Sequence, residues 1–308
     1  MSIASIRTSN ASIFSSLTAP TAVFFGGTAG IGQAMAQSLA SHTQGNANVI
    51  IVGRNAKAAQ EIIDSFPHPS SSAKPIREFV SCDASLMSNV ASATEEVKKL
   101  LGAKKVDFLV LTTGYLTTAG REETTEGMDK KMAVTYYAKW KFVKDLLGSL
   151  NDEGSKVVSV MAPGNGGSID VDDLDMKKSY SAVKVGLRIP TYLDLMSEAF
   201  AQRHPSHSFI HAFPGAVRTN YLYASPSAIF RYTAPLIMGL MYPFTISPRD
   251  CAEYMWHGTL QKTAGAFRVG SRGEDMGKKR YYGDEEQRQK LWDHTAAMVE
   301  AAPAPRSK

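Results

Sequence analysis

The stretch FFGGTAGIGQAMA, residues 24–36, decides the fold class of this 308-residue chain. An apolar run comes directly before it, a helical pattern follows, and Gly26, Gly30 and Gly32 stand between them. Glycines let backbone N–H groups approach a pyrophosphate, and a helix N-terminus adds unpaired donors and the positive end of its dipole. A tight turn with close helix packing would use the same glycines, but the strand–turn–helix context favours a dinucleotide site. The predicted phosphate-binding residues are Gly26, Thr28, Ala29, Gly30, Ile31 and Gly32.

Apolar β-rich runs alternate with helical patterns along the rest of the chain. The predicted strands are 22–25, 49–52, 76–80, 106–111, 156–160, 208–212 and 266–269. The predicted helices are 31–41, 56–65, 86–101, 125–150 and 180–203. This order is typical of parallel strands with helices on both faces, and doubly covered strands are almost continuously apolar. We therefore predict one α/β domain with a Rossmann-type, doubly wound parallel sheet in three layers.

No shift in composition marks a second domain, so the predicted Rossmann domain covers residues 20–300. Residues 1–19 are Ser-rich, with one arginine and no acid, which favours a short surface extension over a mitochondrial presequence. Pro- and Ser-rich residues 67–75 are predicted to form a loop, and residues 301–308 a flexible tail.

The composition excludes several kinds of partner and compartment. The net charge is +5, but the basic residues come in scattered pairs near acids and never alternate with aromatic residues, so no nucleic-acid partner is expected. Cys82 and Cys251 are the two cysteines and no secretory signal is visible, so we expect a cytoplasmic protein without disulfides. The longest apolar run, 233–246, is too short to span a bilayer. No metal site is predicted.

The second predicted strand ends in VGRN, residues 52–55, where nucleotide-binding folds meet the adenosine ribose. An acid there would bind the ribose of NAD, whereas the guanidinium of Arg54, with Asn55 beside it, suits the 2′-phosphate of NADP. The alternative is a solvent-exposed arginine, although the helix dipole disfavours a cation at a helix start. Asp83, with Ala84, is expected at the adenine amino group; it could also cap the helix that follows.

Tyr180 and Lys184 are four residues apart in KKSYSAVKVG, residues 177–186, so on one helix they would share a face. A neighbouring ammonium lowers the pKa of a tyrosine, which would make Tyr180 a proton donor and acceptor near neutral pH. The pair could also be a coincidence, since Tyr137 and Lys141 have the same spacing. That second pair lacks the Pro-Gly turn which follows Tyr180 after a helix and a strand.

The glycine turn, the Tyr-x-x-x-Lys pair and HAFPGAVRTNY at 211–221 together resemble the short-chain dehydrogenase/reductase superfamily. DVDDLDMKKSY at 170–180 resembles its retinol-dehydrogenase-like branch, and VVSVMAPGNGG at 157–167 with YYAKWKF at 136–142 is most similar to fungal members. The resemblance implies NADP(H) as cofactor, Tyr180 as the proton donor and Lys184 on the nicotinamide ribose. It also implies further cofactor contacts from Thr113, Gly114, Pro214, Gly215, Val217 and Thr219.

The chain departs from the family pattern at most catalytic positions. Phe25 replaces the threonine that usually opens the glycine turn, Thr135 stands in the register of the active-site asparagine, and Ala162 replaces the catalytic serine. Losing one donor to a developing oxyanion typically costs about 10²–10³ in rate. Ser159, Ser168 or a hydroxyl of the substrate could replace it, although strand alternation turns Ser159 away from the direction of Ala162.

Residues 220–246 are rich in Tyr, Phe, Met, Leu and Ile, with Arg231 as their only charge. A lid over a bulky lipophilic substrate is the favoured interpretation, with membrane contact, contact between copies in a homo-oligomer, or ordinary core left open. We predict an NADPH-dependent reductase or dehydrogenase that acts on a carbonyl or secondary alcohol of a lipophilic small molecule in fungal secondary metabolism. The alternative is an NADP(H)-binding scaffold or regulator, or an isomerase or cyclase on the same fold.

Overall fold

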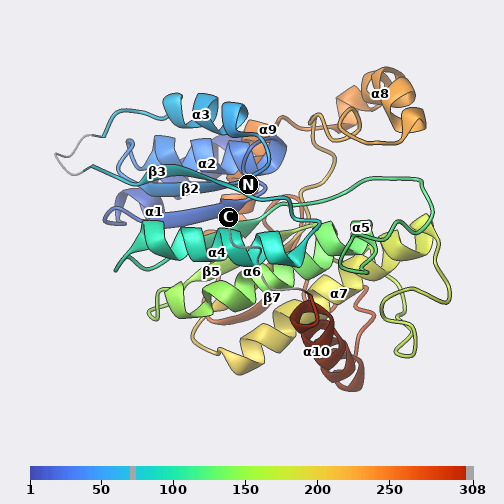
Figure 1. The fold of residues 1–308 in the computed structure, drawn as a ribbon. Coiled ribbons are helices and arrows are strands. Elements are labelled where there is room, and N and C mark those ends of the chain that lie inside the picture. Colours follow the sequence, from blue (N-terminus) through green and yellow to red (C-terminus); the bar gives the residue numbers. More distant parts are fainter. Residues whose placement is uncertain (70–73, 303–308) are drawn as a thin grey trace.

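The computed structural model describes residues 1–69 and 74–302. Within these residues the chain forms a seven-stranded sheet in the order β3-β2-β1-β4-β5-β6-β7, and every neighbouring pair of strands is parallel (Figure 1). The strands are β1 Thr21–Phe25, β2 Asn48–Gly53, β3 Arg77–Ser81, β4 Phe108–Leu111, β5 Lys156–Val160, β6 Ser208–Ala212 and β7 Gly265–Val269. The predicted doubly wound α/β fold is confirmed.

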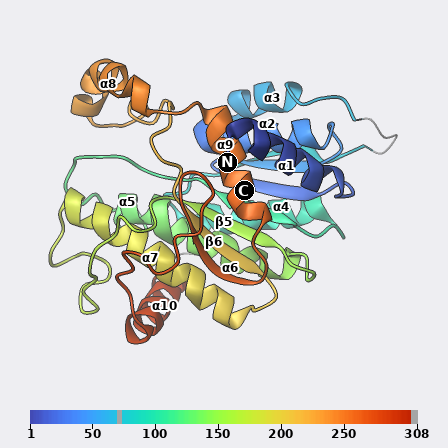
Figure 2. The ribbon, with the colours of Figure 1, turned by 180° about the vertical axis from the view of Figure 1, so that it is seen from behind.

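Helices cover both faces of this sheet, as the two opposite views show (Figures 1 and 2). They are α1 Ile3–Ser15, α2 Gly30–His42, α3 Ala56–Asp64, α4 Met87–Leu101, α5 Lys130–Met132, α6 Ala138–Leu146, α7 Ala182–Arg203, α8 Ala228–Met241, α9 Pro248–Leu260 and α10 Glu285–Glu300. A π-helical turn, Ala133–Tyr137, joins α5 to α6, and 3-10 turns follow α6 at Leu147–Ser149 and α8 at Tyr242–Phe244.

Each face of the sheet has its own hydrophobic core, because side chains alternate along a strand. Phe24 packs on the face of α1, α2 and α9, next to Trp256, and Phe25 packs on the face of α4, α6 and α7, stacked on Phe142. β1 and β4 are neighbours at the centre of the sheet, and the strand order runs outward from them in both directions. The place between β1 and β4, where the strand order reverses its direction, is a topological switch point. In folds of this kind ligands bind there, at the carboxyl ends of the strands.

The prediction of a surface extension at residues 1–19 is wrong. Residues 3–15 form α1, which packs on α9 and α2 and buries Ile6, Asn10 and Phe14. The amide of Asn10 donates to Glu253 Oε2 at 2.8 Å and to the Glu253 carbonyl at 2.9 Å. Because these buried residues are four apart, they form only a narrow strip on the helix. The many serines around them made the segment look like a polar extension.

Three predicted boundaries are also corrected. The predicted helix 125–150 begins only at Lys130 and contains the π-helical turn. Asp129 caps it: its carboxylate accepts the amide of Met132 at 3.0 Å. The predicted strand 106–111 begins at Phe108, and the predicted helix 180–203 begins at Ala182. Parts of the predicted loop 67–75 and tail 301–308 lie outside the described residues.

Candidate active site

The glycine turn after β1 is packed tightly against the end of β4. The amide of Gly26 donates to the carbonyl of Val52 at 2.8 Å, and the hydroxyl of Thr112 donates to the carbonyl of Gly26 at 3.0 Å. Gly26 has φ 96°, a conformation that other residues rarely adopt. Ala29, at the N-cap of α2, makes no side-chain hydrogen bond to the first turn of the helix. The first N–H groups of α2 therefore lack a side-chain cap, which suits an anionic ligand.

A Cβ atom at Gly32 would lie 2.6 Å from Thr112 Oγ1 and 2.7 Å from the carbonyl oxygen of Gly26. We therefore expect Gly32→Ala to lower the free energy of unfolding by about 1–3 kcal/mol, because α2 must move off the turn. Urea denaturation measures this loss. Gly120→Ala is the matched control, since no atom lies within 4 Å of a Cβ there. Equal stability of the two variants would contradict the packing described.

The segment after β6 reaches the same turn. Gly30 has φ 60°, and a Cβ there would lie 3.4 Å from Cγ2 of Thr219. Val217 forms a parallel bridge with Ile246, and the carbonyl of Pro214 accepts a weak hydrogen bond from Cys251 at 3.7 Å. The structure thus brings Thr219 against the predicted phosphate turn. Four more predicted cofactor residues are close to Gly30 or Thr219 in sequence, and all are half-buried: Ile31, Pro214, Gly215 and Val217.

At the end of β2, Arg54 is exposed, and its guanidinium makes no hydrogen bond or ion pair within the part of the chain that the structure describes. Asn55 caps α3 by accepting the amide of Ala58 at 3.0 Å. Asp83 accepts the amide of Ser85 at 3.0 Å, but α4 begins only at Met87, so the suggested capping role of Asp83 is wrong. Ala84 is buried.

The N-terminus of α4 is held instead by a carboxylate that the sequence analysis missed. Glu126 accepts the amide of Ser88 at 3.0 Å and its hydroxyl at 2.6 Å. The two residues are 38 positions apart, so no local pattern reveals the contact.

The loop after β4 is supported by the π-helical turn. The hydroxyl of Thr135, in the register of the expected asparagine, accepts the amide of Tyr115 at 3.3 Å. The buried hydroxyl of Thr113 has no hydrogen-bond partner among the residues described, and a Cβ at Gly114 would lie 3.2 Å from the hydroxyl of Tyr221. The predicted cofactor residue Gly114 therefore lies beside Tyr221 of the predicted lid.

Tyr180 and Lys184 do not share a helix face. Ser181 is the N-cap of α7 and accepts the amide of Lys184 at 3.1 Å, so Tyr180 precedes the helix. The side chain of Lys184 is exposed. The sequence pattern misplaced the helix start because it did not identify Ser181 as a cap, although serine is among the preferred capping residues.

The hydroxyl of Tyr180 is buried and has no partner in hydrogen-bonding geometry among residues 1–69 and 74–302, although the carboxylate of Asp129 lies near it. Burial, and then that negative charge, raise the pKa of Tyr180 to about 12. The pKa lowering predicted from a lysine neighbour is therefore wrong for this structure. The hydroxyl keeps its proton at neutral pH.

At the position of the missing serine, the amide of Ala162 donates to His211 Nε2 at 3.2 Å. Ser159 is buried within β5, paired in register with Leu111 and His211, whereas Ser168 is exposed in the following loop. The chain holds the backbone at Ala162 through a side chain of the neighbouring strand.

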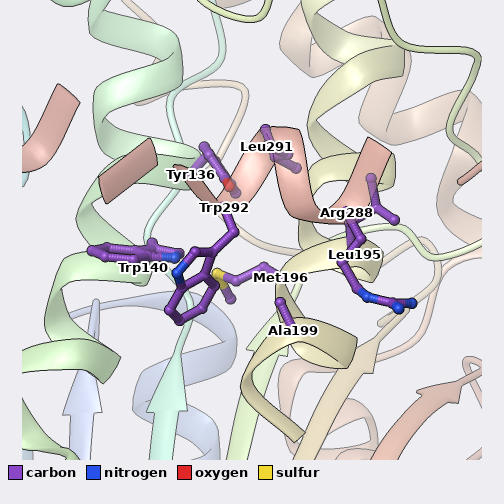
Figure 3. A pocket seen from close by; sticks show the side chains of 8 residues that line it. All are labelled: Tyr136, Trp140, Leu195, Met196, Ala199, Arg288, Leu291 and Trp292. Atoms are coloured by element: carbon purple, nitrogen blue, oxygen red, sulfur yellow. The ribbon is translucent and has the colours of Figure 1, made fainter. Parts of the chain in front are cut away.

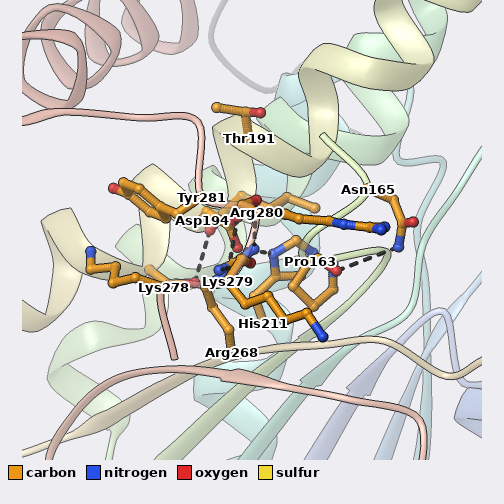
Figure 4. A network of polar contacts seen from close by, with 12 residues as sticks. Pro163, Asn165, Thr191, Asp194, His211, Arg268, Lys278, Lys279, Arg280 and Tyr281 are labelled. Atoms are coloured by element: carbon orange, nitrogen blue, oxygen red, sulfur yellow. Dashed lines mark hydrogen bonds and ion pairs between the residues drawn. The ribbon is translucent and has the colours of Figure 1, made fainter. Parts of the chain in front are cut away.

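That side chain belongs to a buried charged network that the sequence analysis also missed (Figure 4). His211 Nδ1 donates to Asp194 at 2.6 Å, and Arg268 Nε forms an ion pair with the other oxygen of Asp194 at 3.1 Å. Burial lowers the pKa of His211 in spite of Asp194, so the ring is neutral. Arg268 Nη1 donates to the carbonyls of Gly277 and Lys279, at 2.9 and 2.8 Å. The network ties β6, α7 and β7 to the loop after β5.

Two of the hollows in the described part of the chain lie on the helix layers. One lies between α6, α7 and α10, among Trp140, Met196 and Trp292, and is too narrow for a water molecule (Figure 3). The other, between α2 and α3, has a volume of about 140 Å³ and includes Thr28 of the glycine turn. Only the second borders the predicted dinucleotide site.

Known proteins resemble this chain in sequence and in fold. The short chain dehydrogenase family model matches residues 20–224. Oxidoreductase AN1596 of Emericella nidulans is 32% identical, covering 83% of this chain and 76% of its own, and oxidoreductase andH of Emericella variicolor is 31% identical, covering 82% and 73%.

Solved structures share the fold at low sequence identity. A Mycobacterium paratuberculosis protein has a TM-score of 0.67 at 17% identity, covering 91% of this chain and 93% of its own. The MalC reductase/Diels-Alderase of Malbranchea aurantiaca has a TM-score of 0.61 at 17% identity, covering 85% and 98%, and a Burkholderia cenocepacia short chain dehydrogenase has 0.58 at 17%, covering 83% and 98%. With the glycine turn, the sheet order and the family match in agreement, this chain belongs to the short-chain dehydrogenase/reductase superfamily of oxidoreductases.

Proposed function

We propose that the protein is an NADP(H)-dependent reductase or dehydrogenase that acts on a carbonyl or secondary alcohol of a lipophilic small molecule in fungal secondary metabolism, within the retinol-dehydrogenase-like branch. The observation that carries the proposal is the combination of an uncapped α2 N-terminus, a glycine turn with no room for side chains at Gly26 and Gly32, and an exposed guanidinium at Arg54 that pairs with none of the described residues. The related Burkholderia cenocepacia dehydrogenase was solved in complex with NADP, which supports this cofactor.

The residues present fit such a dinucleotide. The amides of the glycine turn would hold the pyrophosphate, Arg54 the 2′-phosphate, and Thr219 would close over the phosphates from the opposite side. When bound, the nicotinamide supplies or accepts a hydride. Tyr180 would donate a proton to the carbonyl oxygen, and its raised pKa keeps the hydroxyl protonated, which is the form that can donate.

Residues 220–246 remain our proposed substrate lid. The hydroxyl of Ser225 donates to the carbonyl of Leu116 at 2.7 Å, and the hydroxyls of Thr118 and Ser227 lie 2.8 Å apart. The base of the segment therefore contacts the loop after β4, next to Thr113 and Gly114. A substrate bound there would meet mostly apolar and aromatic side chains.

The cofactor assignment predicts a specific loss in Arg54→Ala. Charge-assisted hydrogen bonds contribute about 1.5–3 kcal/mol, so NADPH affinity should fall by about tenfold to a hundredfold while NADH affinity stays the same. Isothermal calorimetry with both cofactors measures this. Lys57→Ala is the control, because Lys57 is an exposed cation near the start of α3. An equal effect on NADH and NADPH would rule out a role at the 2′-phosphate.

A second candidate is an NADP(H)-binding protein without ordinary turnover, a scaffold or regulator, or an isomerase or cyclase. It is favoured by the separation of Tyr180 from Lys184 and by Ala162 in the place of serine. The experiment mixes the protein with NADPH, follows cofactor fluorescence, and then follows absorbance with a panel of ketones. Binding without NADPH oxidation across the panel would favour this second candidate.

A further inference from the structure

Helix α8 and the turn after it lie apart from the layers of the domain in both views (Figures 1 and 2). Their large apolar side chains are open to solvent: the exposed fractions are 65% for Ile229, 84% for Tyr232, 66% for Leu236, 69% for Leu240 and 75% for Phe244. We call these five side chains the α8 face. Ala234 is the buried residue of this helix. A folded protein rarely leaves an apolar surface of this kind uncovered.

The four helical members of the α8 face form one stripe. Tyr232, Leu236 and Leu240 follow Ile229 by three, seven and eleven residues, which puts them on one side of a helix. Ile237 and Met241, which are also exposed, widen the stripe. In the part of the chain that the structure describes, the helix makes its most extensive contacts with the turn Tyr242–Phe244 that follows it. Among the residues that the structure describes, the stripe therefore stays largely open to solvent.

The charged residues of the segment 216–249 are all positive. No Asp or Glu occurs between residues 216 and 249, whereas Arg218, Arg231 and Arg249 do. None of these arginines has a carboxylate partner among the described residues, and Arg218 holds the end of the segment by donating to the Thr245 carbonyl at 2.7 Å. Arg231 lies on the side of α8 opposite the stripe, where it donates to the carbonyls of Ser225 and Pro226 at 3.2 and 3.1 Å. Arg218 and Arg249, at the ends of the segment, give an apolar stripe whose nearby charges complement a surface of anionic headgroups over hydrocarbon.

The aromatic residues of the segment fit the same surface. Tyr223 and Tyr242 are exposed near its two ends, and tyrosine suits a boundary where one end of the ring is apolar and the other wet. Among the described residues, no helix is long and apolar enough to cross a bilayer. We propose that the α8 face docks on the surface of an anionic lipid bilayer, with the helix lying in the interface. This inference does not depend on the proposed reaction.

Flotation of the full chain with lipid vesicles tests the proposal, with vesicles of phosphatidylcholine and phosphatidylserine compared with phosphatidylcholine alone. We expect binding that is stronger on the anionic vesicles. The double variant Leu236→Ser/Leu240→Ser should lower the partition coefficient at least roughly tenfold on both kinds of vesicle, because it removes apolar area that docking would bury. Arg249→Glu should lower it roughly tenfold on the anionic vesicles only.

Matched controls separate docking from general effects. Leu17→Ser and Lys104→Glu change an exposed leucine and an exposed lysine in loops at the amino ends of β1 and β4, opposite the edge that carries α8, and should bind like the wild type. Circular dichroism melts verify that each variant is folded.

Three results would overturn the proposal: no flotation, flotation that the α8 variants leave unchanged, or a dimer in light scattering that the double leucine variant dissociates while vesicles bind neither form. The last result would assign the α8 face to a second copy of the chain. Protection of residues 228–244 from hydrogen exchange on anionic vesicles, without a change in oligomeric mass, would support lipid docking directly.

Discussion

Tyr180→Phe should lower the rate of NADPH-dependent carbonyl reduction by about 10²–10⁴-fold, the usual contribution of a positioned general acid. The substitution removes one buried hydroxyl that has no hydrogen-bond partner in the described part of the chain, so the fold should remain intact. Steady-state kinetics with a ketone found in the substrate panel measures the loss, and NADPH affinity should be unchanged. Tyr282→Phe, which removes the hydroxyl of an exposed tyrosine, is the control.

The direction of the pKa shift adds a test of pH dependence. Because the pKa of Tyr180 is raised to about 12, the hydroxyl stays protonated well above neutral pH. The rate of reduction should therefore not fall from about pH 7 to about pH 9 through titration of this group, whose ordinary pKa is about 10. If Tyr180→Phe keeps the wild-type turnover, Tyr180 is not the proton donor. If no ketone in the panel causes the protein to oxidise NADPH, the scaffold candidate is favoured.

Asp194→Ala should lower the free energy of unfolding by about 3–5 kcal/mol, the range for removing one partner of a buried ion pair. Asp194 is 4% exposed and receives both His211 and Arg268, which are 0% and 7% exposed. Without the carboxylate, the guanidinium of Arg268 remains buried without a counter-charge. Urea denaturation measures the change, and Asp152→Ala, at an exposed aspartate, should stay close to the wild type.

The same substitution should also affect the loop after β5, because Asp194 holds one ring nitrogen of His211 and the other ring nitrogen accepts the amide of Ala162. Hydrogen exchange at the amide of Ala162 should speed up in Asp194→Asn, which keeps the side-chain shape and removes the charge. Unchanged stability in Asp194→Ala together with unchanged exchange in Asp194→Asn would show that the network does not support the site.

Much of the sheet could be predicted from local patterns. The run at 22–25 predicts β1 because consecutive apolar residues suit a strand covered on both faces, and the glycines at 26, 30 and 32 predict a tight turn into α2. The start of α7 was harder to predict, because the helical pattern extends back to Tyr180. Ser181 caps the helix, so Tyr180 lies outside it. In α1, the buried strip of Ile6, Asn10 and Phe14 is masked by the serines around it.

The sequence by itself determined the parallel α/β sheet and the phosphate turn, since both depend on periodicity and backbone freedom over a few consecutive residues. Only the tertiary structure decided that Asp129 lies beside Tyr180, that Asp194 joins His211 to Arg268, and that α8 is left uncovered. The first two contacts join residues far apart in the chain, and the order of the strands in the sheet sets which of them meet. The exposure of α8 depends on whether any other segment reaches it, which no local pattern encodes.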